Sequence, residues 1–150
     1  MDQRRFDPHP EIETLVPHRP PMLLIDRIVE FDIDTGMTCE AEIHEDHLFL
    51  VHDRLEAPAL LEMIAQTAAA FLGYRGLLTG TEVHHGYLVG IQGMDFEDVA
   101  IPGGSTMRVE VKEERGRGDF GWYSGVISLG DQQACQGTIM VYRDPERKSD

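Results

Sequence analysis

The positions of hydrophobic residues along the chain predict six β-strands. Alternation is clearest over residues 106–113, where Met107, Val109 and Val111 would lie on one face of a strand and charged residues on the other. Shorter alternating or apolar runs predict the remaining strands, over residues 22–31, 37–43, 86–96, 122–129 and 134–142. Turn signals that contain glycine separate neighbouring strands at residues 34–36, 116–118 and 130–131.

A different pattern fills residues 57–72, which are almost wholly apolar and therefore predict a buried helix. Pro58 suits the first turn of this helix and Gly76 suits its C-terminal cap, which gives a length of about 18 residues, or roughly 27 Å. The order of two strands, one helix and four strands indicates an α+β fold, with an antiparallel sheet wrapped around the helix. We expect one domain over residues 1–150, with its core at about 15–142. We also expect a dimer, because the sheet of one chain is too small to complete the core.

Glu62 is the one acidic residue inside the apolar helix segment. A carboxyl group in apolar surroundings resists ionisation, and a carboxyl group that keeps its proton near neutral pH can act as a general acid. Gln66 lies one helical turn further on the same face, so it is the expected polar neighbour. The alternative is a structural glutamate that is bonded to backbone or water.

Charge and composition exclude several classes of function. The net charge of −14 argues against nucleic acid and against an anionic membrane surface as partners. No apolar run reaches the roughly 18 residues of a membrane span, so we expect no membrane insertion. Residues 1–8 have no apolar signal segment, and Cys39 and Cys135 form no paired motif. We therefore expect a cytoplasmic protein with reduced thiols.

The histidines could in principle bind a metal ion. His44, His47 and His52 lie near one another in the sequence, and His84 and His85 are adjacent. No cysteine or carboxylate stands at a recognised ligand spacing from them, so we predict neither a metal site nor a cofactor.

Three stretches together resemble one enzyme family. Residues 15–28, LVPHRPPMLLIDRI, resemble the N-terminal signature of the 3-hydroxyacyl-[acyl-carrier-protein] dehydratases. Residues 60–66, LLEMIAQ, resemble their central helix, and residues 90–96 and 101–104 resemble the strand and Pro-Gly turn that follow. The chain is similar to a divergent branch of this family, the dehydratase-like proteins of aryl-polyene-type pathways.

The resemblance implies a hotdog fold, in which a sheet wraps a central helix. It implies removal of water from a 3-hydroxyacyl thioester, carried by acyl carrier protein or coenzyme A, to give the trans-2-enoyl thioester. It further implies a homodimer, or a heterodimer with another hotdog chain. Each site would combine a helix carboxylate, here Glu62, with a loop histidine of the other subunit, and Gln66 would be the family's helix glutamine.

The loop before the helix departs from the family pattern. Leu48, followed by Phe49, stands where the family has its histidine. His52 and His47 are the candidate replacements for the base, with Glu62 as the acid. Neighbouring side chains of an extended segment point to opposite faces, so a Leu48 that faces the pocket would turn His47 away and favour His52.

Four residues are candidates for substrate binding. Gln66 and Phe49 would border the substrate, and the backbone N–H groups of Ala59 and Leu60, near the helix N-terminus, would bind the thioester oxygen. We predict a structural role for His18, with its side chain bonded to backbone at the sheet edge.

Three functions are consistent with these residues. The first is a dehydratase that uses Glu62 and a loop histidine. The second is a hotdog thioesterase in which Glu62 positions water, since one fold hosts several reactions. The third is a non-catalytic acyl-binding or partner subunit of an active hotdog dehydratase.

Overall fold

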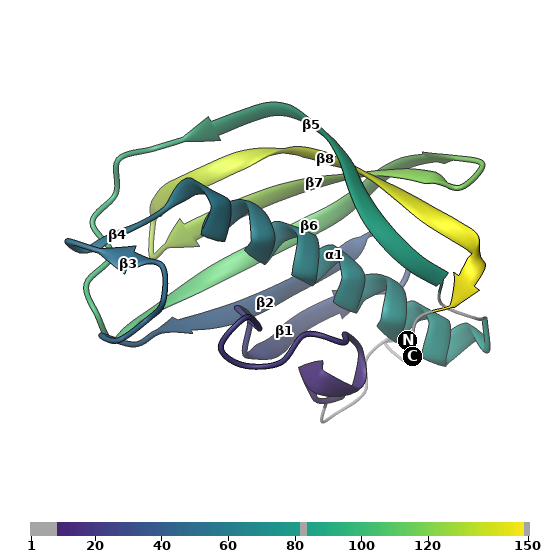
Figure 1. Ribbon diagram of the computed structural model, residues 1–150, viewed down its shortest axis with the longest axis horizontal. Helices are drawn as coiled ribbons and strands as arrows, with labels where there is room; N and C mark the ends of the chain where they lie inside the picture. Colours follow the sequence, from purple (N-terminus) through teal and green to yellow (C-terminus); the bar gives the residue numbers. More distant parts are fainter. Residues whose placement is uncertain (1–8, 82–83, 149–150) are drawn as a thin grey trace.

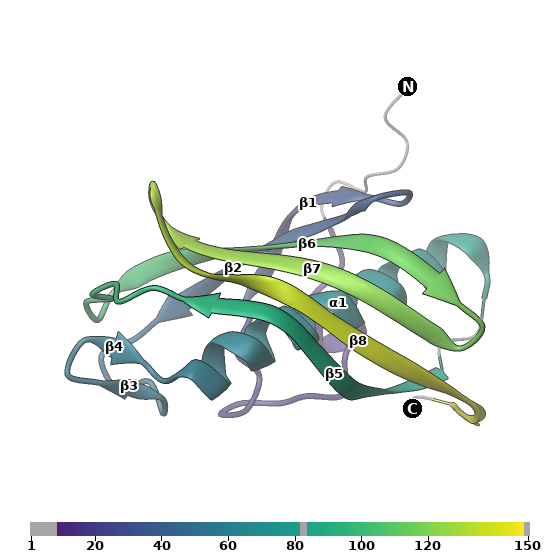
Figure 2. The same cartoon turned by 90° about the horizontal axis from the view of Figure 1, so that it is seen from above.

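A six-stranded antiparallel sheet curls around one long helix in this computed structural model, which describes residues 9–81 and 84–148 (Figure 1). The strands run in the spatial order β1-β2-β6-β7-β8-β5. Their bounds are β1 Arg27–Asp32, β2 Gly36–Ile43, β5 His84–Phe96, β6 Ser105–Arg117, β7 Phe120–Leu129 and β8 Gln132–Lys148. Figure 2 shows β5, β8 and β7 lying over the helix α1, Ala57–Thr79. The predicted α+β architecture is therefore confirmed.

Three smaller elements complete the fold. A single turn of 3-10 helix, η1, spans Ile12–Thr14. A hairpin of β3, Leu50–Val51, and β4, Arg54–Leu55, precedes α1 and was not predicted from the sequence. No helix in the described part of the chain is long and apolar enough to cross a membrane.

The core lies between α1 and the concave face of the sheet. Met63, Ile64 and Phe71 of the helix are fully buried. The predicted alternation of β6 is confirmed, because Met107, Val109 and Val111 are all 0% exposed. Burial of each large apolar side chain stabilises the fold by about 1.5–3 kcal/mol.

The helix is longer than the sequence predicted. It continues through Gly76, which is buried, and ends at Gly80, whose φ of 68° is the left-handed conformation of a helix C-cap. The predicted cap at Gly76 was wrong. The apolar pattern continues through Leu77 and Leu78, and Gly76 is buried inside the helix rather than at its end.

Residues 22–25 do not form the predicted beginning of β1. The strand starts at Arg27, and the backbone N–H of Leu24 donates to the side chain of Gln66 rather than to a neighbouring strand. Leu24 and Ile25 are both buried, which explains why the sequence has a continuous apolar run there. This segment instead lies against α1 and carries part of the site described below.

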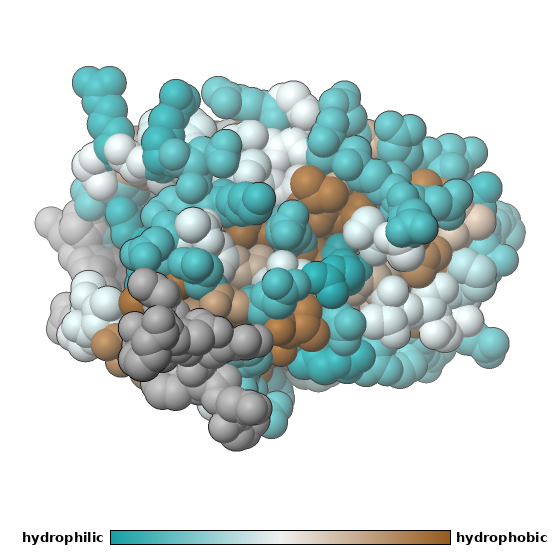
Figure 3. All heavy atoms as spheres, turned by 180° about the vertical axis from the view of Figure 1, so that it is seen from behind, coloured by the Kyte–Doolittle hydropathy of each residue, from teal (hydrophilic) through white to brown (hydrophobic). Residues whose placement is uncertain are grey.

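The edge strand β5 is apolar and exposed. It pairs only with β8, and Leu88, Val89 and Ile91 are each more than 40% exposed. Hydrophobic residues also lie among polar ones near the middle of the face seen in Figure 3. An apolar sheet edge of this kind is a surface on which another strand can pair. The expected dimer stays a prediction.

Candidate active site

Glu62 lies on a face of α1 that is only half-buried. Its side chain is 38% exposed, and Ala65, Ala69 and Leu72 follow it on the same half-buried stripe. The prediction that this helix segment is wholly buried was wrong for the single chain, because this stripe faces a cavity rather than the core.

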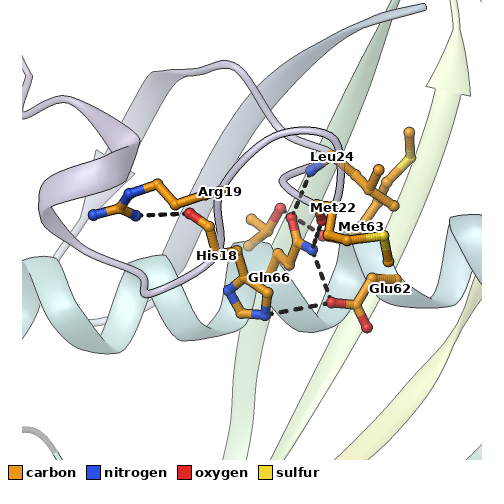
Figure 4. Close-up of polar contacts among 8 residues, drawn as sticks. His18, Arg19, Met22, Leu24, Glu62, Met63 and Gln66 are labelled. Carbon is orange, nitrogen blue, oxygen red and sulfur yellow. Dashed lines mark hydrogen bonds and ion pairs between the residues drawn. The ribbon is translucent and has the colours of Figure 1, made fainter. Parts of the chain in front are cut away.

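Gln66 holds Glu62 in place. Its side-chain Nε2 donates to Glu62 Oε2 at 2.8 Å and to the carbonyl oxygen of Met22 at 2.8 Å. Its Oε1 accepts the backbone N–H of Leu24 at 2.8 Å. Gln66 is only 1% exposed, and both amide hydrogens and the carbonyl oxygen are engaged, so its side chain is fixed in one orientation. The predicted contact between Gln66 and Glu62 is confirmed, and Figure 4 shows how it ties the helix to the 22–24 segment.

His18 approaches the same oxygen of Glu62 that Gln66 binds (Figure 4). Its Nε2 lies 3.5 Å from Glu62 Oε2, an ion-pair distance when the imidazole is protonated. The turn that carries His18 is held by Arg19, whose guanidinium donates to the carbonyl oxygens of Val16 at 3.0 Å and of His18 at 2.7 Å. The site thus brings together residues far apart in the sequence.

The predicted bond from the His18 side chain to backbone was wrong. Its Nδ1 is buried without a hydrogen-bond partner, and its Nε2 faces Glu62 rather than a backbone group. Sequence reasoning missed this pairing because no local spacing relates a turn residue to a helix residue so much later in the chain.

A cavity of about 260 Å³ opens at this pair. His18, Glu62 and Gln66 form its polar end. Apolar side chains from the helix, the N-terminal segment, β5 and β8 line most of the remainder: Leu15, Ala65, Ala68, Ala69, Leu72, Leu88 and Val141. A few polar groups beside a largely apolar wall are typical of a binding site for a small molecule with an apolar part.

The two predicted loop histidines lie away from this cavity in the single chain. His47 is half-buried, its Nδ1 accepts the N–H of Phe49 at 3.1 Å, and burial lowers its pKa. His52 is exposed at the tip of the β3–β4 hairpin, where it and Asp53 have φ values of 49° and 57°. These angles are those of a two-residue hairpin turn with left-handed residues. Neither histidine borders Glu62 here, and a contribution of either to another subunit stays a prediction.

The predicted substrate-binding residues occupy varied positions. Phe49 is partly buried against the core, whereas Ala59 and Leu60 are buried in the first turn of α1. The N–H groups of Ala59 and Leu60 donate to the carbonyl oxygen of Glu56, at 2.9 and 3.4 Å. They would have to exchange that partner to bind a thioester oxygen, and their role stays a prediction.

The described residues near this site do not favour a metal ion or a reactive thiol. Among the described residues, no three His, Cys, Asp or Glu side chains are grouped to hold a metal ion, and the side chains of His84 and His85 lie outside the described ones. Burial raises the pKa of the Cys39 thiol to about 12 and of the Cys135 thiol to about 11. Both thiols therefore keep their protons at neutral pH and are poor nucleophiles.

The helix wrapped by an antiparallel sheet defines a hotdog protein, with a glutamate and a histidine beside an apolar cavity. Comparison with known proteins gives the family. A model of the ApeP-like family, described as ApeP dehydratase, matches residues 10–149, and the chain belongs to this family.

Curated relatives agree with this assignment, and a solved structure shares the fold. The chain is 34% identical over 146 residues to the 3-hydroxyacyl-[acyl-carrier-protein] dehydratase FabZ of Chloroflexus aggregans, covering 91% of this chain and 96% of the relative. It is 31% identical over 147 residues to the protein of the same name from Roseiflexus castenholzii, covering 91% and 96%. Among solved structures, the dehydratase heterocomplex ApeI:P from Xenorhabdus doucetiae has a similar fold. Its TM-score is 0.81 at 21% identity, over 92% of this chain and 93% of that one.

Proposed function

We propose that this chain removes water from 3-hydroxyacyl thioesters on acyl carrier protein, giving trans-2-enoyl thioesters. The observation that carries the proposal is the contact of Glu62 with both Gln66 and His18 at the polar end of an apolar cavity. The carrier follows the names of the curated relatives, with a coenzyme A thioester as the alternative carrier.

The geometry supports the two proton transfers of dehydration. Neutral His18 removes the proton from C2 of the substrate, which the thioester carbonyl acidifies. The electron pair of that C–H bond forms the C2=C3 double bond, and the 3-hydroxyl group takes the proton of Glu62 and leaves as water. This leaves a protonated His18 beside an ionised Glu62, an ion pair with 3.5 Å between Nε2 and Oε2, and the proton returns to Glu62 before the next turnover.

His18 is our choice for the base because it alone of the histidines with described side chains borders the cavity that holds Glu62. His47 and His52 are the competing choices, each acting from the loop of a second subunit. The lowered pKa of His47 would keep its imidazole neutral and able to accept a proton.

A second hotdog chain completes the assembly that we propose. Two exposed apolar surfaces support it: Leu48, which is 58% exposed, and the edge strand β5 with Leu88, Val89 and Ile91. The solved heterocomplex is a precedent for two dehydratase chains that assemble. We propose that the two chains pair along β5. We also propose that the protein acts in the cytoplasm, in accord with its free and buried cysteines.

The mass of the purified chain in solution, alone and mixed with a second hotdog dehydratase, tests this assembly. A dimer mass in either sample supports it, and mixing tells a homodimer from a heterodimer. A monomer mass in both samples at all concentrations would contradict it.

The reaction itself is tested by turnover of a short 3-hydroxyacyl thioester, followed by mass spectrometry that separates loss of water from loss of the acyl group. We expect loss of one water. Glu62→Gln keeps the shape and the bond to Gln66 but removes the ionisable proton, so it should lower kcat by about 10²–10⁴-fold. Release of free acid instead would make the protein a thioesterase, and no turnover would make it a partner subunit.

Three matched histidine variants identify the base. His18→Gln should lower kcat as strongly as Glu62→Gln, while His47→Gln and His52→Gln should retain activity within a few-fold. Loss of activity in one of the loop variants, with His18→Gln active, would refute His18 and restore the loop histidine that the sequence predicts. Each variant is first checked for an unchanged melting temperature.

A further inference from the structure

Arg143 lies at the end of the cavity opposite to Glu62. It belongs to β8, pairs across the sheet with Gly86 of β5, and both residues line the cavity. On the helix side that end is formed by Leu72, which follows Glu62 by about ten residues, or roughly 15 Å along α1 at 1.5 Å per residue.

The position of Arg143 beyond Leu72 is consistent with its electrostatic neighbours. Glu113 accepts two hydrogen bonds from Arg75, at 2.9 and 3.0 Å, one helical turn after Leu72. These bonds lower the pKa of Glu113, and the positive charge of Arg143 lowers it further. Arg143 is thus near the Arg75 end of the helix and far from Glu62.

One nitrogen of the Arg143 guanidinium has no partner. Its Nε is buried without a hydrogen-bond partner, and Arg143 forms no ion pair within 4.0 Å among the described residues. Glu113, its anionic neighbour, is already bound by Arg75 on both carboxylate oxygens. A partly buried cation without a bonded acceptor is costly unless a ligand supplies the acceptor.

We propose that Arg143 selects substrates whose acyl tail ends in an oxygen acceptor, with a carboxylate as the best match. This inference rests on the proposed function, since it places C2 and C3 of the substrate at His18 and Glu62. The tail then runs along Ala65, Ala69 and Leu72 to the guanidinium. Arg143 is a specificity residue and takes no part in the proton transfers.

The lining of the cavity favours the acyl tail over the pantetheine arm as the occupant. Between Gln66 and Arg143 the cavity wall offers the apolar side chains of Ala68, Ala69 and Leu72 from the helix, and Val141 from β8. A pantetheine arm carries amides that would lose their hydrogen bonds to water there, which is unfavourable, whereas methylene groups gain from burial.

Binding of matched probes tests the inference separately from catalysis. The probes are 3-hydroxyacyl pantetheine amides, which cannot be hydrolysed, in a series of chain lengths that end in either a methyl group or a carboxylate. A third series has a methyl-ended tail and a phosphate on the arm. The dissociation constant of each is measured for the wild type, for Arg143→Gln and for Arg115→Gln. Arg115→Gln removes the same charge from an exposed residue that stacks on Trp122 and lies outside the cavity.

We expect the wild type to bind one length of the carboxylate-ended series at least tenfold more tightly than the methyl-ended probe of that length. Arg143→Gln should remove this preference without weakening methyl-ended binding, and Arg115→Gln should keep it. A tenfold change corresponds to about 1.4 kcal/mol.

Three results would overturn the inference: no preference for the carboxylate, equal weakening of both series by Arg143→Gln, or a loss confined to the phosphorylated arm. The last would assign Arg143 to the pantetheine phosphate. Because binding is read without turnover, a failed dehydration assay with the expected binding pattern would refute the proposed reaction and leave the specificity inference standing.

Discussion

Replacement of Gln66 by methionine should destabilise the fold as well as the site. Methionine has nearly the same shape as glutamine but cannot make the three hydrogen bonds to Met22, Leu24 and Glu62. The N–H of Leu24 is buried, and leaving a buried donor unsatisfied costs about 1–3 kcal/mol. The bonds to the Met22 carbonyl and to the partly exposed Glu62 add about 0.5–1.5 kcal/mol each, because water can reach both acceptors. We therefore expect a loss of about 2–6 kcal/mol in the free energy of unfolding.

Urea denaturation, followed by the fluorescence of the single tryptophan, Trp122, measures this loss. A control variant, Gln92→Met, makes the same chemical change at an exposed position of β5 and should stay within about 0.5 kcal/mol of the wild type. A loss below about 1 kcal/mol for Gln66→Met, equal to the control, would refute the argument. It would mean that water or a shifted backbone satisfies the hydrogen-bonding groups of residues 22–24 without the glutamine.

Two further predictions concern the sheet and its contact with the helix. Glu113→Gln should make the free energy of unfolding less dependent on pH in acid. In the wild type the bonds from Arg75 hold the pKa of Glu113 below its usual range. This carboxylate therefore stabilises the fold above its unfolded-state pKa, and the stabilisation is lost as the pH falls through the lowered folded-state pKa. Thermal melts between neutral and acid pH check this, and a parallel pH dependence in variant and wild type would contradict it. Gly125→Ala should destabilise the fold by about 1–3 kcal/mol, because an added Cβ would lie 2.6 Å from Ile64 Cγ2 in the core; urea denaturation measures the loss, and an unchanged midpoint would show that Ile64 moves aside freely.

The sheet was predictable from the sequence because it follows a local rule. Alternation along β6 marks a strand with one buried face, and burial of Met107, Val109 and Val111 has the same period. The end of α1 was less predictable, since Gly76 and Gly80 both suit a C-cap and only packing decides between them. Residues 22–25 were misread because a continuous apolar run indicates burial but does not name the hydrogen-bond partner.

The candidate site was predictable only in part, for the same reason. Glu62 and Gln66 share a helix face, so their contact follows from helical spacing. His18 meets them only through tertiary structure, which no local pattern encodes. The approach of the N-terminal segment depends on Gly73 as well, because a Cβ there would lie 2.8 Å from the carbonyl oxygen of Leu15.

The bonds of Gln66 couple the N-terminal segment to the acid of the site. Gln66 holds both the 22–24 segment, which follows His18 in the chain, and the carboxylate that His18 contacts. If His18 is the base, each chain carries both proton-transfer groups. The reaction then does not need the histidine that Leu48 replaces. Leu48 can then serve the contact between subunits, in keeping with its exposure in the single chain.

If the base comes from a partner loop instead, His18 has a different role. At 3.5 Å it would stabilise ionised Glu62 after Glu62 has given its proton to the leaving hydroxyl. The two mechanisms differ in one measurable respect: dilution that dissociates the subunits abolishes turnover only in the second.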